Sequence, residues 1–317
     1  MTPTLYISPD YTCNERCVFC PCSQNSHSYT ALTLDELCES VDLAIQERKI
    51  EMVLISGGEP TMYRDLIPFL RHVRSRQIRF GLLSNSIKFA SSSYLDRFLR
   101  EVGSDFELTT AFHSCIPEEH DRITGLPNSF QRSLQGVQNL WKAGVHVTVK
   151  YNINNLTYKQ LPEFAQWIYN TFPDSISWVL CNIDVCGHAE TNKKCTAVSF
   201  DQSRTFLETV LDYVISQAEN GRRRVVQVYN TPLCCVDPYY WPFLQKNEGG
   251  VMSAFRIPYQ SVSENRLLLD AQGDGGAVFE PCQSCALQNY CPGTWYKTGE
   301  MFSDRCFHPF QAEEDHD

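Results

Sequence analysis

The sequence lacks three features that would each assign it to a broad class of protein. It carries 27 basic residues against 37 acidic ones, so it lacks the basic surface that binds nucleic acid. No apolar run approaches the ~20 residues of a membrane-spanning helix. Its first residues, MTPTLYISPD, have neither the basic start nor the apolar segment of a signal peptide. We therefore expect a cytoplasmic protein with no nucleic-acid or membrane partner, and we expect its one basic run, Arg222–Arg224, to be a solvated helix end.

Cysteine, by contrast, is abundant, with 15 in a chain of 317 residues. An odd number of cysteines suits a set of disulfides poorly, and the cytoplasm keeps thiols reduced. Clustered thiols in a reducing compartment are best explained as metal ligands or redox groups.

Strand-like runs alternate with amphipathic helical segments through the first two thirds of the chain. The expected strands are Leu5–Ser8, Met52–Ser56, Arg79–Asn85, Phe106–Phe112, His146–Asn152 and Ile176–Cys181. The expected helices are Thr33–Gln46, Tyr63–Arg74, Ser93–Glu101, Ser129–Lys142, Tyr158–Tyr169 and Asp201–Ile215. Six βα units in series require parallel strands joined by right-handed crossovers, which predicts an α/β layer or a barrel. The pattern ends near Gly221, so we expect a core domain over residues 1–220 and a smaller, loop-rich, metal-stabilised module over residues 221–317.

The unusual residues follow the predicted strands. They are Cys13–Cys20 after the first strand, Gly57–Pro60 after the second, Asn85 at the end of the third, His113 and Cys115 after the fourth, and Cys181 to His188 at the end of the sixth. Reactive groups in parallel sheets collect at the carboxyl ends of the strands. We therefore expect these residues to meet at one rim.

Three of these cysteines, Cys13, Cys17 and Cys20, stand at positions i, i+4 and i+7. Three thiolates can each bind one iron of a [4Fe–4S] cluster and leave the fourth iron open to a small molecule. A zinc knuckle is the alternative, but zinc sites usually add a second cysteine pair or histidines.

Together, the segments CNERCVFC (residues 13–20) and GGEP (residues 57–60) resemble the signatures of the radical S-adenosylmethionine (SAM) superfamily. The resemblance spans residues 4 to about 195 and implies a partial (β/α)6 TIM-like barrel. It implies that Cys13, Cys17 and Cys20 bind the cluster and that SAM chelates the open iron. Glu59 would accept a hydrogen bond from the SAM amino group, and the two glycines would let the backbone approach the ligand. The SAM-binding residues implied in this way are Phe19, Gly57, Gly58, Glu59, Pro60, Asn85, His113 and Ser114.

A second group of cysteines follows residue 221. A zinc ribbon is one interpretation of this group, but the segment from Cys282 to Phe310 resembles the auxiliary-cluster tails of SPASM and twitch radical SAM proteins. The resemblance implies one auxiliary [4Fe–4S] cluster, since six cysteines are too few for two. The preferred ligands are Cys234, Cys282, Cys285 and Cys291, with Cys235 or Cys306 as alternatives.

The resemblance also implies an enzyme, a radical SAM oxidoreductase or maturase. Its 5′-deoxyadenosyl radical would abstract hydrogen from a peptide or peptide-like substrate, because FHSCIPEEHDRITGLPNSF (residues 112–130) and the tail resemble peptide-maturing members. The alternative is a dehydrogenase or epimerase of a sugar or cyclitol. Expected partners are an electron donor such as flavodoxin or ferredoxin and, because the first strand begins near the N-terminus, a separate peptide-recognition protein.

Two further cysteines, Cys181 and Cys186, are the candidate catalytic residues. A thiol at the rim can donate a hydrogen atom to a substrate radical. Free cysteines also serve simply as small buried hydrophobic residues.

Overall fold

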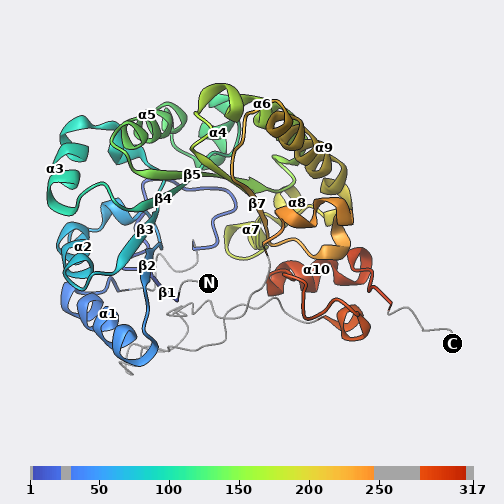
Figure 1. The fold of residues 1–317 in the computed structure, drawn as a ribbon, viewed down its shortest axis with the longest axis horizontal. Coiled ribbons are helices and arrows are strands. Elements are labelled where there is room, and N and C mark those ends of the chain that lie inside the picture. The colour runs from blue at the N-terminus through green and yellow to red at the C-terminus, as the bar shows by residue number, and fades with distance from the viewer. Residues whose placement is uncertain (1–2, 23–29, 246–278, 312–317) are drawn as a thin grey trace.

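The computed structural model describes residues 3–22, 30–245 and 279–311. Seven parallel strands form one sheet, and their order in the sheet is their order in the chain, from β1 to β7. The sheet curls into a partial barrel with helices around its outside (Figure 1). The α/β class and the partial barrel expected from the sequence are therefore confirmed, with seven strands in place of six.

The elements follow one another as βα units as far as β6. The strands are β1 (Thr4–Ile7), β2 (Met52–Ile55), β3 (Arg79–Leu83), β4 (Glu107–Ala111), β5 (His146–Ile153), β6 (Ser177–Asn182) and β7 (Val226–Tyr229). The α-helices are α1 (Leu34–Arg48), α2 (Leu66–Ser75), α3 (Ser92–Val102), α4 (Pro117–Thr124), α5 (Ser129–Lys142), α6 (Leu161–Thr171), α7 (His188–Thr191), α8 (Lys193–Thr196), α9 (Phe200–Glu219) and α10 (Tyr296–Cys306). Within the described ranges, no helix combines the length and the apolar character needed to cross a membrane.

Local sequence signals account for most of these boundaries. Helix α1 begins with a capping box, in which the Glu36 amide donates to the Thr33 hydroxyl and the Thr33 amide donates to the Glu36 carboxylate at 2.8 Å. Helix α5 has the bounds that its periodicity predicts. The sequence reasoning missed α4, α7, α8 and α10, which are short or lie in segments without a clear helical period.

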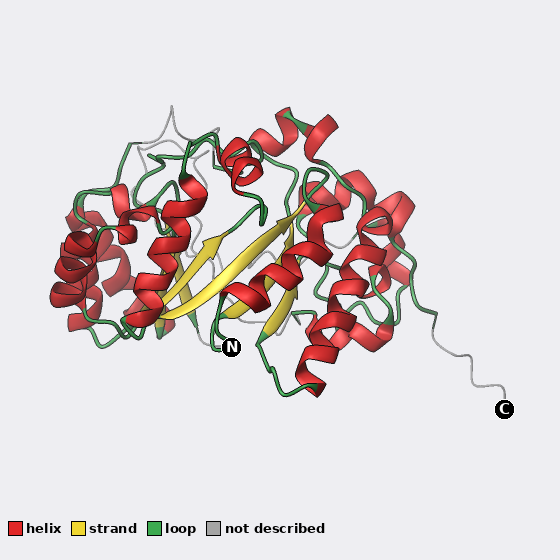
Figure 2. Ribbon diagram, turned by 90° about the horizontal axis from the view of Figure 1, so that it is seen from above, coloured by secondary structure: helices red, strands yellow, loops and turns green. Residues whose placement is uncertain are grey.

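The core lies between the convex face of the sheet and the helices. Figure 2 shows the strands running in one direction with helices flanking them. On β5 the side chains alternate, and Tyr151 is fully buried against Phe164 of α6 with ring centroids 4.2 Å apart. Because successive side chains of a strand point to opposite faces, Lys150 and Asn152 lie on the concave face. Asn152 pairs in register with Cys181 of β6, so Cys181 also faces the barrel interior.

The sheet continues past residue 220, where the domain boundary was expected, because β7 pairs in parallel with β6. Beyond β7 the described chain forms the short 3-10 helices η5 (Leu233–Cys235), η6 (Pro238–Phe243) and η7 (Glu280–Ser284), and then α10. Several hydrogen bonds fasten this part to the barrel. The Thr294 hydroxyl donates to the Asn230 side chain at 2.6 Å, and Thr298 of α10 contacts Asp184 after β6.

Within the basic run, Arg223 is exposed as the sequence predicts, but Arg224 is not. Arg224 is buried, and its guanidinium donates to the carbonyl oxygens of Ile176 and Phe172. The guanidinium also lies 4.9 Å from the Tyr169 ring centroid and forms an ion pair with Asp174. This arginine therefore fastens β7 to the segment between α6 and β6.

Candidate functional site

The cysteine loop, residues 12–21, leaves the carboxyl end of β1 and brings three thiols together. The Glu15 amide donates to the Cys13 sulfur at 3.4 Å, and the Cys20 amide donates to the Cys17 carbonyl at 3.1 Å. Cys13 is exposed, but the protein atoms packed around its loop still raise the pKa of its thiol, and the neighbouring Glu59, Glu15 and Cys20 act in the same direction. Burial also raises the pKa of Cys17, with further contributions from Glu15, Cys20 and Cys13.

This loop suits a cationic centre. The thiols that it gathers resist ionisation in one another's presence, and a bound metal reverses that effect because a coordinating thiol is deprotonated outright. A backbone amide already points at one sulfur and would stabilise its thiolate. Three thiols on one loop fit an iron–sulfur cluster with three protein ligands.

The segment Gly57–Glu59, at the end of β2, holds the cysteine loop by its backbone. The Gly58 amide donates to the Asp10 carbonyl and the Glu59 amide to the Thr12 carbonyl, both at 2.9 Å. A Cβ atom on Gly57 would lie 2.4 Å from the Asp10 oxygen, and one on Gly58 would lie 2.2 Å from the Thr12 oxygen. The close approach that requires glycine here is therefore between two protein backbones, whereas the sequence reasoning assigned it to a ligand.

Glu59 connects the ends of β2 and β3 to this loop. Its carboxylate is buried, and Oε1 accepts from the Thr61 amide and hydroxyl and from the Ser84 hydroxyl. Its Oε2 accepts from the Asn85 amide at 2.7 Å. Burial raises the pKa of this carboxyl, and these hydrogen bonds oppose the rise. Because a carboxylate oxygen has two lone pairs, Oε2 keeps an acceptor position for an ammonium group.

Asn85 reaches the cysteine loop through a residue that the sequence reasoning missed. Its Nδ2 donates to Oδ1 of Asn14 at 2.7 Å, while its Oδ1 accepts from the Ile87 amide. Pro60 is buried at the start of the short 3-10 helix η2 (Pro60–Met62). The residues expected after β2 and β3 thus lie beside those expected after β1.

His113, just after β4, contacts the same loop through Phe19. The two rings are 4.9 Å apart in an edge-to-face arrangement, and His113 stacks on His120 of α4 at 5.4 Å. Burial holds the pKa of His113 well below its usual value, and the nearby His120 and Lys150 act in the same direction. Its Nδ1 is buried and finds no hydrogen-bond partner within the described ranges, so a neutral imidazole nitrogen remains for a ligand.

The hydroxyl of Ser114, the next residue, is hydrogen-bonded to other residues of the protein. Its hydroxyl lies 2.8 Å from the Gln160 side chain and 3.2 Å from Glu119, and it accepts from the Ile116 amide. His113, through Nδ1, is therefore better placed than Ser114 to hydrogen-bond a bound molecule.

The two candidate catalytic cysteines lie in different surroundings. Cys181 is buried on the concave face. Burial raises the pKa of its thiol, and the hydrogen-bonded Lys150 opposes the rise. Cys186 is half-buried, and burial raises the pKa of its thiol to about 12, with further contributions from Asp184, Glu190 and Cys20. Cys181 thus lies in the barrel interior, and Cys186 lies near the cysteine loop.

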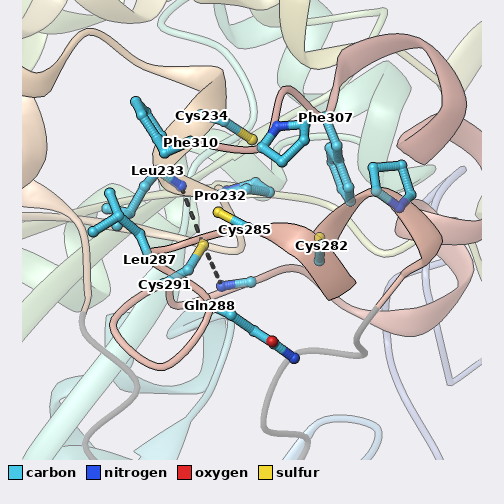
Figure 3. A pocket seen from close by; sticks show the side chains of 13 residues that line it. Pro232, Leu233, Cys234, Cys282, Cys285, Leu287, Gln288, Cys291, Phe307 and Phe310 are labelled. Atoms are coloured by element: carbon cyan, nitrogen blue, oxygen red, sulfur yellow. Dashed lines mark hydrogen bonds between the residues drawn. The ribbon is translucent and has the colours of Figure 1, made fainter. Parts of the chain in front are cut away.

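The C-terminal cysteines line a pocket of their own. Cys234 comes from η5, Cys282 from η7, and Cys285 and Cys291 from the chain that follows (Figure 3). The rest of the lining is mostly apolar, with Leu233, Leu287, Phe307 and Phe310 among its members.

Hydrogen bonds reach the sulfurs of two of these cysteines, but only Cys234 has a lowered pKa, because burial raises the pKa of Cys291. The Cys291 sulfur accepts from the amides of Leu233 and Gly293, both at 3.4 Å. A hydrogen bond from the Cys235 thiol lowers the pKa of Cys234 to about 6, and His308 contributes in the same direction. Four thiols around one apolar pocket fit an auxiliary iron–sulfur cluster.

Cys306 and Cys235 lie outside that pocket. Both are buried with Phe200, Phe302 and Phe307 in a small apolar cluster.

Within the described ranges, no three His, Cys, Asp or Glu side chains converge as closely as a single metal ion requires. A cubane spreads its thiolate ligands over separate irons, so it does not need that convergence.

Comparison with known proteins agrees with this geometry. A model of the radical SAM superfamily matches residues 7–168. A probable GTP 3′,8-cyclase of Sulfurisphaera tokodaii is 27% identical over 159 residues, which cover 48% of this chain and 49% of that protein. The Fe-coproporphyrin III synthase of Methanosarcina barkeri is 23% identical over 249 residues, which cover 77% of this chain and 59% of that protein. The chain thus spans about half the length of the curated relatives it matches.

Among solved structures, Streptococcus suis SuiB bound to the precursor peptide SuiA is similar over 98% of this chain and 75% of that one. The TM-score is 0.66 at 15% sequence identity. At this identity the similarity shows a shared fold.

Proposed function

The chain belongs to the radical SAM superfamily, and we propose that it is an enzyme that abstracts a hydrogen atom from a peptide or peptide-like substrate. Membership implies a [4Fe–4S] cluster and SAM. When bound, these supply the one-electron cleavage of SAM that yields a 5′-deoxyadenosyl radical. The observation that carries the proposal is the gathering of Cys13, Cys17 and Cys20 on a loop fastened to the Gly57–Glu59 backbone.

The chain's own residues would divide the remaining tasks. The three cysteines would hold the cluster, and Oε2 of Glu59 would accept a hydrogen bond from the ammonium group of SAM. Phe19 and His113 would bound the SAM pocket, because they lie against each other beside the loop. Cys234, Cys282, Cys285 and Cys291 would hold one auxiliary cluster.

A peptide is the preferred substrate because the similarity to peptide-bound SuiB covers 98% of this chain. A small-molecule substrate, such as a sugar or cyclitol, is the second candidate. The names of two relatives favour it, because they refer to GTP and to coproporphyrin.

Anaerobic reconstitution with iron, sulfide, SAM and a reductant tests the enzyme class. We expect 5′-deoxyadenosine from the wild type and none from Cys17→Ala. A reconstituted wild type that binds iron but never cleaves SAM would remove the proposal. For the substrate class, peptide pools and sugar pools are compared for the increase in 5′-deoxyadenosine that each produces. A response to sugars alone would reject the peptide.

Cys181 is proposed as the hydrogen-atom donor, because it alone of the two candidates lies on the concave face. Donation would leave a thiyl radical, which takes up one electron and one proton to be restored. The electron would come from the auxiliary cluster or from flavodoxin or ferredoxin. In D2O the thiol exchanges, so the product should carry deuterium, and Cys181→Ala should abolish this label while Cys186→Ala keeps it. The reverse result would move the role to Cys186.

A further inference from the structure

A second segment holds the cysteine loop, from the far end of the sheet. This clamp segment, Cys186–Asn192, follows β6 and includes α7. The His188 amide donates to the Cys20 carbonyl at 2.9 Å, and the Asn192 side chain donates to the Val18 carbonyl at 2.7 Å. The imidazole Nδ1 of His188 lies 3.1 Å from the Cys17 carbonyl.

The contact at Cys17 has a defined direction. A carbonyl oxygen only accepts, so Nδ1 of His188 must carry the proton and donate it. The same oxygen accepts from the Cys20 amide, which closes a turn between two of the three cysteines. His188 therefore fixes the orientation of the peptide group on which this turn depends.

The approach is too close to be incidental. Gly187 has a φ of +60°, and a Cβ atom there would lie 2.6 Å from the carbonyl oxygens of both Cys20 and Pro21. The neighbouring Ala189 is fully buried in an apolar cluster with Phe19 and Ile123. Backbone and imidazole hydrogen bonds, together with apolar packing, thus hold the clamp segment against the cysteine loop.

The residues just before the clamp segment contact the C-terminal part of the chain. The Thr298 hydroxyl donates to the Asp184 carboxylate at 3.0 Å and accepts from the Val185 amide at 3.2 Å. The Thr298 amide also donates to Asp184, at 3.2 Å. Docking of α10 therefore sets the position from which the clamp segment reaches the cysteine loop.

We propose that His188 is a positioning residue that fixes the Cys17–Cys20 turn for cluster binding, and that Thr298 holds the clamp segment in the position that allows it. The inference rests on the proposed function, because it assumes that the cysteine loop holds a cluster. Hydrogen-bonded groups behind metal ligands typically affect metal affinity by ~10–100-fold when they are lost.

The test uses the full-length, reconstituted protein. The SAM-responsive electron paramagnetic resonance (EPR) signal of the reduced protein distinguishes the N-terminal cluster from an auxiliary one, and its decay in a chelator measures cluster retention. We expect His188→Ala to accelerate this decay by roughly tenfold or more. His188→Asn should restore most of the retention, because the Asn Nδ2 group can donate to the same carbonyl. Thr298→Val should accelerate the decay less than His188→Ala does. The control is Lys194→Ala, an exposed change in the neighbouring α8.

Each outcome decides between the two proposals. Decay at the wild-type rate in His188→Ala, or equal defects in the Ala and Asn variants, overturns the positioning role. If His188→Ala does not fold by circular dichroism, Asn192→Ala is measured instead, and an unchanged decay rate there counts equally against the clamp. Absence of any SAM-responsive signal in the wild type rejects the proposed function itself.

Discussion

Replacing Gly58 by Ala tests whether the glycine pair serves the cysteine loop. The new Cβ atom would lie 2.2 Å from the Thr12 carbonyl oxygen and 2.5 Å from the Tyr11 carbonyl carbon. Ordinary contact between such atoms needs ~3.5 Å. Both neighbours are backbone atoms, so no rotamer change relieves the overlap, and the loop must retreat by about 1 Å.

This displacement has two separable consequences. Overpacking of this kind typically costs about 1–3 kcal/mol of folding free energy. A misplacement of ~1 Å at a reacting site can lower the rate by roughly 100-fold. Because the loop carries the three cysteines, we expect SAM cleavage to fall far more than stability.

The assay compares Gly58→Ala with Gly144→Ala in the reconstituted protein. Gly144 has a φ of +82°, but apart from its chain neighbours no atom of the described residues lies within 4 Å of a new Cβ, so its replacement strains the backbone without a collision. Thermal unfolding and the rate of 5′-deoxyadenosine formation are measured for both. Gly144→Ala should lose stability and keep its activity. A Gly58→Ala variant that cleaves SAM as fast as the wild type would refute the reasoning.

Three further predictions concern the pocket, the histidine pair and the buried arginine. The double variant Cys282→Ser, Cys285→Ser should lower the iron content from about eight to about four per chain. The control Cys306→Ser, outside the pocket, should leave the iron content unchanged. An unchanged iron content in the double variant would contradict the auxiliary site. Burial lowers the pKa of His120 to about 4, so the unfolded chain binds a proton first as the pH falls below about 6.5, and the holoprotein should lose up to about 3 kcal/mol of unfolding free energy by pH 4. Denaturant titrations of His120→Asn should show a smaller loss, because the buried His113, whose pKa is also lowered, keeps its own contribution. A loss as large as that of the wild type would exclude His120 as a source. Arg224→Met leaves the buried carbonyl oxygens of Ile176 and Phe172 without a charged donor and should lower the free energy of unfolding by about 3 kcal/mol in a denaturant titration. Arg223→Met, at an exposed position, should change it little. Equal effects of the two variants would show that Arg224 is not the source of the stabilisation.

Most strands and helices of the barrel can be predicted from the sequence, because the periodicity of apolar residues indicates which side of an element is buried. The six expected strands and six expected helices all form, and Ser129–Lys142 has the predicted bounds. The short helix α4 could not be predicted because its eight residues complete too few turns for a clear period. Arg224 was misjudged for a different reason, since its partners Phe172 and Ile176, between α6 and β6, lie about 50 residues away in the chain.

The chemistry proposed for the cysteine loop follows from local sequence alone. The residues that predict this chemistry lie within about 50 residues of one another: Cys13, Cys17 and Cys20 at their spacing, and the GGEP segment that follows them. The type and spacing of ligands are properties of a short stretch of chain. Only the tertiary structure decided which distant groups hold that loop. His188 and Asn192 reach it across about 170 residues, through hydrogen bonds between a side chain and a backbone carbonyl. Such contacts leave no periodic mark in the sequence, because every residue has a carbonyl and only the fold brings one of them within reach.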